Sequence, residues 1–211
     1  MTGPGEVPTA EDRANVEAQL GRPARGDWRV GRRCHLGRPV VLLAAPLLED
    51  GTPFPTLCWL TCPLARRRVS RLEQRGRVRE LSERLARDPA LARAHAAADA
   101  AYAGLRAERL PPGVDPALAA RVRGGVGGNT GEGVKCLHAH DAWRRAGGPS
   151  PVGELFAAEV DPLDCVSPCV AGGSWNPAWS EPPNARSGPV APPSEARPGG
   201  AEGSPGIPDG A

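Results

Sequence analysis

The chain has 211 residues, of which 40% are hydrophobic, so it is long enough for one domain with a modest core and too short for two full domains. Its formal net charge of +2 gives no strong field that would attract nucleic acid or acidic membranes over long distances. The 27 glycines and 25 prolines approach the level of low-complexity sequence, but most of this excess is terminal.

The first residues, Met1 to Glu6, lack the basic region and apolar stretch of a secretory signal. The longest apolar run, residues 40–48, is far short of the roughly 20 residues that a membrane-spanning helix needs. The sequence therefore predicts a cytoplasmic protein without membrane insertion. In that compartment the six cysteines are expected to be reduced, which favours metal binding, catalysis or burial over disulfides.

A short helix is predicted within an extension over residues 1–20, because Thr9 to Asp12 resembles a capping box and Gly21 follows the last apolar position. Three strands follow. Trp28 and Val30 alternate with polar residues, a glycine turn leads into the apolar run 39–43, and residues 56–61 have strand composition.

From residue 64 to 110 the apolar spacing becomes helical, and Gly76 and Asp88 with Pro89 divide this region into three helices. Asp115 and Pro116 begin a further short helix. A glycine-rich loop over residues 124–133 then leads into a helix predicted over 134–146. These patterns indicate an α+β fold: one domain over residues 21–172, with a small antiparallel sheet near the N-terminus packed against several helices.

Residues 173–211 are rich in proline, glycine and serine and have little apolar content, so a disordered tail is predicted there. Trp175 and Trp179 are unusual within such a tail, and the sequence assigns them no role.

One six-residue segment concentrates the reactive side chains: Lys135, the only lysine, is followed by Cys136, His138 and His140. If the segment is helical, Cys136 and His140 share one face because they are four residues apart, and His138 points to the other side. Tetrahedral zinc needs four thiolate or imidazole ligands, so we expect Cys34 and Cys62, at the ends of predicted strands, to complete the site. The predicted zinc ligands are Cys34, Cys62, Cys136 and one of His138 or His140, with His140 preferred.

Two alternatives remain open. In the first, Cys136 at a helix start beside Lys135 and His138 is a catalytic thiol in an enzyme that acts on an anionic or phosphorylated small molecule. Gly127, Gly128 and Lys135 could bind that anion, although the loop lacks both the Walker A pattern and the dinucleotide pattern. The second alternative is a non-catalytic binding module in which the site is structural or the cysteines are merely buried.

Two weaker patterns accompany the cluster. The pairs Cys58 with Cys62 and Cys165 with Cys169 have spacing compatible with a four-cysteine zinc site, but they lack knuckle glycines. Between residues 65 and 88 arginine is abundant, but no aromatic residue is present there to stack on bases. Nucleic acid is therefore an unlikely partner.

Several motifs in one order resemble a bacterial family catalogued as domain of unknown function 501. They are Arg33-Cys34 with Gly37 and Pro39, residues 51–57, residues 59–63, Leu72-Glu73, residues 135–140 and Pro151-Val152-Gly153. The resemblance covers residues 21–153 and implies a mostly actinobacterial family with no established activity. The resemblance favours Cys34, Cys62, Cys136, His138 and His140 over Cys58 as candidate site residues. Cys58 stands where the family usually has an aromatic residue.

Overall fold

A computed structural model describes residues 5–131 and 133–183. Its helices are α1 (Ala10–Leu20), α2 (Pro63–Gln74), α3 (Arg77–Arg87), α4 (Pro89–Glu108), α5 (Pro116–Arg121), α6 (Leu137–Arg145) and α7 (Pro151–Val160), with the 3-10 turn η1 (Val126–Gly128). Its strands are β1 (Trp28–Arg33), β2 (Pro39–Ala44), β3 (Cys58–Leu60), β4 (Val170–Ala171) and β5 (Ser174–Trp175). The predicted α+β architecture, with a small N-terminal sheet against several helices, is confirmed. None of the described helices is both long and apolar enough to cross a membrane.

The strands β1, β2 and β3 form an antiparallel sheet in that order. Every residue of the central strand β2 is buried, as expected for an apolar run that is covered on both faces. Leu42 pairs with Val30 and Trp59 on one face, and Val41 pairs with Leu60 on the other. The sheet therefore separates a small hydrophobic cluster on its first face from the main core on its second.

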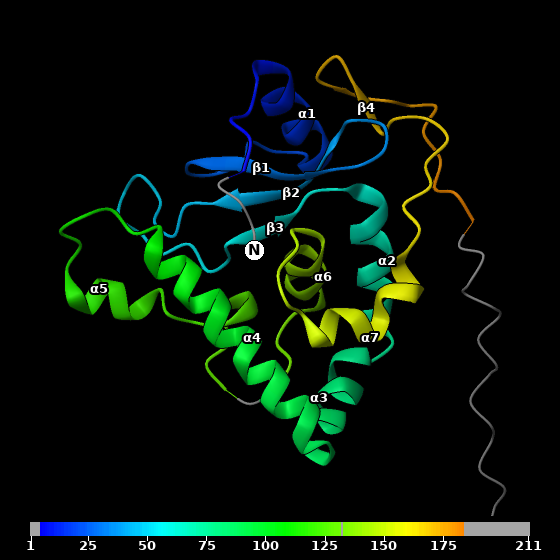
Figure 1. Cartoon of the computed structure of the whole chain (residues 1–211). Coiled ribbons are helices and arrows are strands. Elements are labelled where there is room, and N and C mark those ends of the chain that lie inside the picture. Colours follow the sequence, from blue (N-terminus) through cyan, green and yellow to red (C-terminus); the bar gives the residue numbers. More distant parts are fainter. Residues whose placement is uncertain (1–4, 132, 184–211) are drawn as a thin grey trace, which may run out of the picture.

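Helix α1 and the β4–β5 hairpin lie on the first face of the sheet, and α6 lies against the second face, flanked by α2 and α7 (Figure 1). Helix α1 begins at the predicted capping box, in which Thr9 and Asp12 bond each other's backbone amide groups. It ends at Gly21, whose φ of 72° is the left-handed conformation that glycine adopts without strain. Both ends of this helix are as predicted.

The predicted division of the central region into three helices is also confirmed. Gly76 separates α2 from α3, and Asp88 separates α3 from α4. The Asp88 carboxylate accepts hydrogen bonds from the amides of Ala90 and Leu91, so it satisfies the first donors of α4. Helix α3 packs against both α2 and α4 (Figure 1), and buried side chains of all three helices belong to the main core.

The C-terminal part of the domain extends further than predicted. Helix α7, which the sequence analysis did not identify, begins where the Ser150 hydroxyl accepts a hydrogen bond from the Gly153 amide. Residues 173–183, expected in the disordered tail, pack on the domain: the Trp179 side chain is 93% buried and Arg67 lies over its ring. The packed part of the chain therefore extends past residue 172, because Trp179 supplies apolar surface that the composition of this segment otherwise lacks. The rest of the predicted tail, residues 184–211, lies outside the described residues.

The side chain of Tyr102 on α4 connects the helical layer to the sheet. Its hydroxyl accepts hydrogen bonds from the backbone amides of Leu57 at 2.6 Å and Cys58 at 3.2 Å, in a fully buried position. We expect Tyr102→Phe to lower the free energy of unfolding by about 1–3 kcal/mol, because it leaves buried donors without this acceptor. Urea denaturation at neutral pH measures this change, and an unaltered midpoint would contradict it.

Candidate metal centre

Glu73, Cys136 and His138 form a cluster between the end of α2 and the start of α6. One ligand atom from each side chain lies within 4.8 Å of the other two. Within residues 5–131 and 133–183, no other group of three His, Cys, Asp or Glu side chains meets this limit. Each of the three is partly exposed, so the cluster is reachable from solvent. It could hold a metal ion.

Glu73 holds the cluster together. One carboxylate oxygen lies 3.1 Å from His138 Nδ1, and the other accepts a hydrogen bond of 2.7 Å from the Leu137 amide. The second bond satisfies a free donor at the first turn of α6, where a negative charge is favoured. Because the same carboxylate caps the helix and pairs with the imidazole, Glu73 fixes His138 relative to Cys136.

The backbone at Cys136 explains why His138, and not His140, joins it. Cys136 has extended φ and ψ of −154° and 119°, and α6 begins only at Leu137, three residues later than predicted. The four-residue helical spacing therefore does not apply to Cys136 and His140. His140 instead points into the core, where its Nδ1 lies 3.2 Å from the Ser150 hydroxyl and its ring lies 5.4 Å from that of His95.

The two histidines of the segment differ in protonation. Burial disfavours charge on His138, but hydrogen bonds and attraction from Cys136 and Glu73 outweigh this effect and raise its pKa to about 10. Burial, followed by repulsion from His95, lowers the pKa of His140 to about 3. In the metal-free protein at neutral pH, His138 is therefore a cation beside Glu73 and Cys136, and His140 is neutral.

We expect Glu73→Gln to lower the pKa of His138 in the metal-free protein, because the substitution removes an anionic partner. A pKa raised from 6.5 to about 10 means that the folded state holds this proton more tightly than the unfolded state. The resulting stabilisation is complete below pH 6.5 and is lost as the pH rises through 10. Titration of the imidazole signals by NMR in both proteins measures the shift, and identical pKa values would contradict it.

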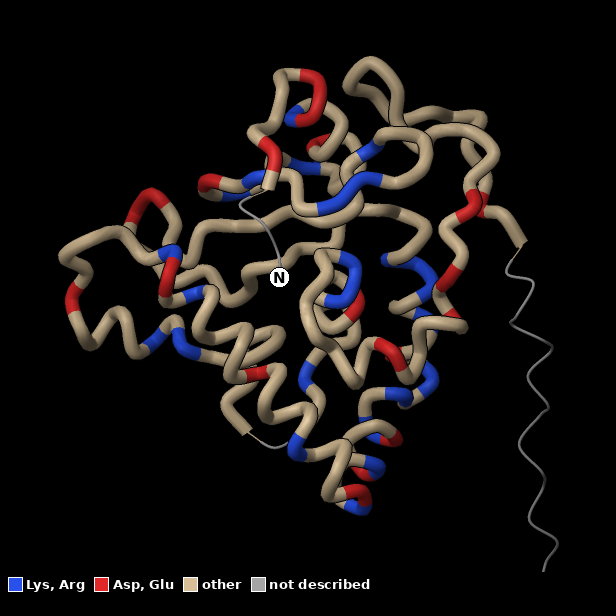
Figure 2. The backbone as a smooth tube through the Cα atoms, viewed as in Figure 1, with Lys and Arg blue, Asp and Glu red and all other residues tan. Residues whose placement is uncertain are grey.

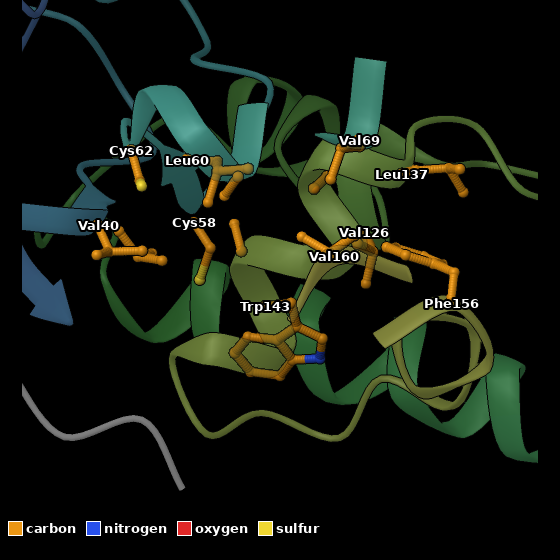
Figure 3. Close-up of a cluster of buried hydrophobic side chains, with 14 of the residues drawn as sticks. Val40, Cys58, Leu60, Cys62, Val69, Val126, Leu137, Trp143, Phe156 and Val160 are labelled. Atoms are coloured by element: carbon orange, nitrogen blue, oxygen red, sulfur yellow. The ribbon is translucent and has the colours of Figure 1, made fainter. Parts of the chain in front are cut away.

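Cys34 and Cys62 lie elsewhere. Cys62 precedes the first residue of α2 and Glu73 lies in its last turn, so about 16 Å of helix separates the two positions. In Figure 3, Cys62 lies near Val40 at one side of the core cluster, whereas Leu137, the neighbour of Cys136 in the chain, lies at the opposite side. Cys34 and Cys62 do line one cavity together, as expected from their positions at neighbouring strand ends, but Cys136 and His140 do not line it. The predicted four-ligand set is thus divided over three places.

The glycine loop is held from within. The Asp99 carboxylate accepts hydrogen bonds from the Val126 amide at 2.9 Å and the Asn129 side chain at 2.8 Å. The Gly128 amide donates to Gly125, and Lys135 Nζ donates to the Gly128 carbonyl at 3.2 Å. Gly127, Gly128 and Lys135 were predicted to bind an anion. In the structure, however, the Lys135 amine already contacts a carbonyl, and the Asp99 carboxylate already accepts hydrogen bonds from the loop.

An arginine-lined groove of about 600 Å³ opens beside His138. Its wall on α2 includes Arg66, Arg67, Ser70 and Arg71. Ser70 Oγ lies 3.2 Å from His138 Nε2, so the groove reaches the metal-capable cluster. Figure 2 shows the basic positions that recur along α2 and α3. This surface favours an anionic ligand next to the cluster.

Two members of this site were not predicted from the sequence. Glu73 belongs to a family motif without an assigned role, and the sequence around Ser70 does not distinguish it from a surface residue. Both lie on a charged amphipathic helix, where such residues usually form a solvated face. The only signal in the sequence is that Arg66, Ser70 and Glu73 recur at helical spacing on one face.

The comparisons with known proteins give one match. The model of a family described as "Protein of unknown function (DUF501)" matches residues 30–158. The matched range includes Glu73, Cys136 and His138 and ends before Cys165. No curated protein and no solved structure matches the chain.

Proposed function

The chain belongs to the DUF501 family, whose description assigns no activity, and we propose from its own residues that it binds a divalent metal ion, zinc in preference. The ligands would be Glu73, Cys136 and His138. The observation that carries this proposal is the convergence of a carboxylate, a thiol and an imidazole within 4.8 Å of one another. These are the three ligand types that zinc takes in proteins.

Three protein ligands leave one position of a tetrahedral ion open, as in catalytic zinc sites. A metal bound in this way supplies a polarised water molecule at neutral pH. The groove beside His138 would hold an anionic small molecule, such as a phosphorylated metabolite, through Arg66 and Arg67, whereas Arg71 is already paired with Glu181. We therefore assign the site to hydrolysis of an anionic substrate, in which water adds to the electrophilic centre and the leaving group departs with a proton.

His138 links metal binding to pH. It must be neutral to coordinate a metal, and its pKa of about 10 in the metal-free protein means that binding displaces a proton. The Cys136 thiol also loses its proton on binding. Zinc affinity at this site should therefore increase as the pH rises from 6 towards 9.

Protection of Cys136 from alkylation tests the proposal. In zinc-loaded protein, Cys136 should resist iodoacetamide, and removal of zinc by a chelator should expose it. Peptide mass spectrometry separates Cys136 from the five other cysteines. Equal and rapid labelling of Cys136 with and without zinc would contradict metal binding there.

A second candidate function is supported by the pairing of Cys136 with a protonated His138 at the start of α6. Cys136 lies immediately before the first residue of α6 and beside the His138 imidazolium, so it could act directly as a nucleophile on the same anionic substrates. Under this alternative, Cys136 is alkylated rapidly whether or not zinc is present, and Cys136→Ser keeps its fold. A non-catalytic module would differ from both, because removal of a structural metal would unfold the domain.

A further inference from the structure

Four of the six cysteines surround one small cavity at the end of the sheet where β1 and β3 finish. The side chains that line it include Cys34, Cys62, Cys165 and Cys169. The cavity volume of about 20 Å³ suits a single water molecule or ion. The four residues come from three distant segments: the turn between β1 and β2, the start of α2, and the chain that follows α7. None of the residues of the Glu73 cluster lines this cavity.

Two of the sulfur atoms accept hydrogen bonds from side-chain N–H groups. Gln19 Nε2 lies 3.6 Å from the Cys169 sulfur, and Trp179 Nε1 lies 3.5 Å from the Cys165 sulfur. Neutral thiols are weak acceptors, whereas N–H donors are matched to the negative charge of a thiolate. Donors directed at ligand atoms in this way are typical of the shell around a bound metal.

Cys62 lies at the start of a helix. It is the residue immediately before α2, and its buried side chain makes no capping hydrogen bond to the first turn of that helix. The positive end of the helix dipole favours negative charge at this position.

We propose that Cys34, Cys62, Cys165 and Cys169 bind one zinc ion as four thiolates, in a structural site separate from the Glu73 cluster. Four cysteines with no open position are the usual donor set of structural zinc. No three of these sulfurs lie within 4.8 Å of one another, so the ion must draw them inward. It would then join the segment after α7 to the sheet, and this cross-link explains how residues 161–183 hold their place with little regular structure.

The site can be isolated by studying the Cys136→Ser chain, in which the Glu73 cluster has lost its thiolate. When purified under reducing conditions, this variant should retain about one zinc per chain and give the strong thiolate-to-metal absorption of a tetrahedral site after cobalt substitution. Adding Cys165→Ser should remove both the zinc and that absorption. Adding Cys58→Ser should remove neither, because Cys58 is buried in β3 and does not line the cavity.

Even if the double variants fail to fold, cobalt titration of the Cys136→Ser chain tests whether the four cysteines bind a metal ion. Folded, reduced protein that binds no cobalt with thiolate absorption would overturn the proposal. A Cys165–Cys169 disulfide in protein purified without oxidant would also overturn it. The Glu73 cluster is tested separately in the Cys165→Ser chain, so failure of one site is distinguishable from failure of the other.

Discussion

Replacement of Asp141 by alanine is expected to lower the free energy of unfolding by about 3–5 kcal/mol, the cost of breaking a buried ion pair by removing one partner. The Asp141 side chain is fully buried and accepts hydrogen bonds from Arg144 at 2.9 Å and Arg145 at 2.7 Å. Both arginines are largely buried and also contact Asp161, so alanine would leave two cations sharing one carboxylate. Chemical denaturation at neutral pH measures the loss.

Asp164→Ala is the matched control for Asp141→Ala. Asp164 also faces a buried arginine, Arg68, but at 3.6 Å and with a side chain that is 49% exposed. Its removal should cost no more than about 1 kcal/mol, because the carboxylate is half exposed and Arg68 keeps its contacts with Glu181 and with two backbone carbonyls. If both substitutions lowered the free energy of unfolding equally, burial of the Asp141 carboxylate would not determine how much it contributes to stability.

Replacement of Cys136 by serine is expected to weaken zinc binding at the Glu73 cluster by more than about 100-fold, since loss of a second-shell partner alone costs 10- to 100-fold. Serine keeps the size of the side chain but does not provide a thiolate. Competition with a chromophoric chelator measures the affinity, and the Cys165→Ser background limits the measurement to this site.

Lys135→Met provides the control for Cys136→Ser. Lys135 is adjacent in sequence but its amine contacts the Gly128 carbonyl, away from the three ligands. Zinc affinity should therefore be unchanged in Lys135→Met. If both variants lost zinc affinity to a comparable extent, residues 135–140 would affect zinc binding through their charge or conformation rather than through coordination by Cys136.

Local signals in the sequence predicted most of the fold. Helix α1, the three-stranded sheet and the breaks at Gly76 and Asp88 each depend on cap residues, apolar spacing or turn chemistry within a few positions. Helix α7 was not predicted although Ser150 and Pro151 are good starting residues, because the same residues form part of a family motif and no acidic residue stands at the third helical position to complete a capping box. The packing of residues 173–183 depends on tertiary contacts of Trp179 that composition does not reveal.

The candidate site was predicted only in part. Cys136 and His138 were identified because reactive side chains are scarce and therefore conspicuous in this chain. His140 was preferred to His138 as a ligand on the assumption that Cys136 is helical. This assumption is wrong, because α6 begins only at Leu137. Glu73 comes from a helix some 60 residues earlier, and no local pattern distinguishes it from the other charged residues of α2.

Diffraction at the zinc absorption edge, from crystals grown with zinc, tests whether Glu73, Cys136 and His138 bind the metal. We expect an anomalous peak bonded to all three side chains, at about 2.3 Å from sulfur and about 2.0–2.2 Å from the nitrogen and oxygen ligands. Well-ordered Cys136, His138 and Glu73 side chains with no peak between them, in crystals that hold zinc elsewhere in the molecule, would contradict it.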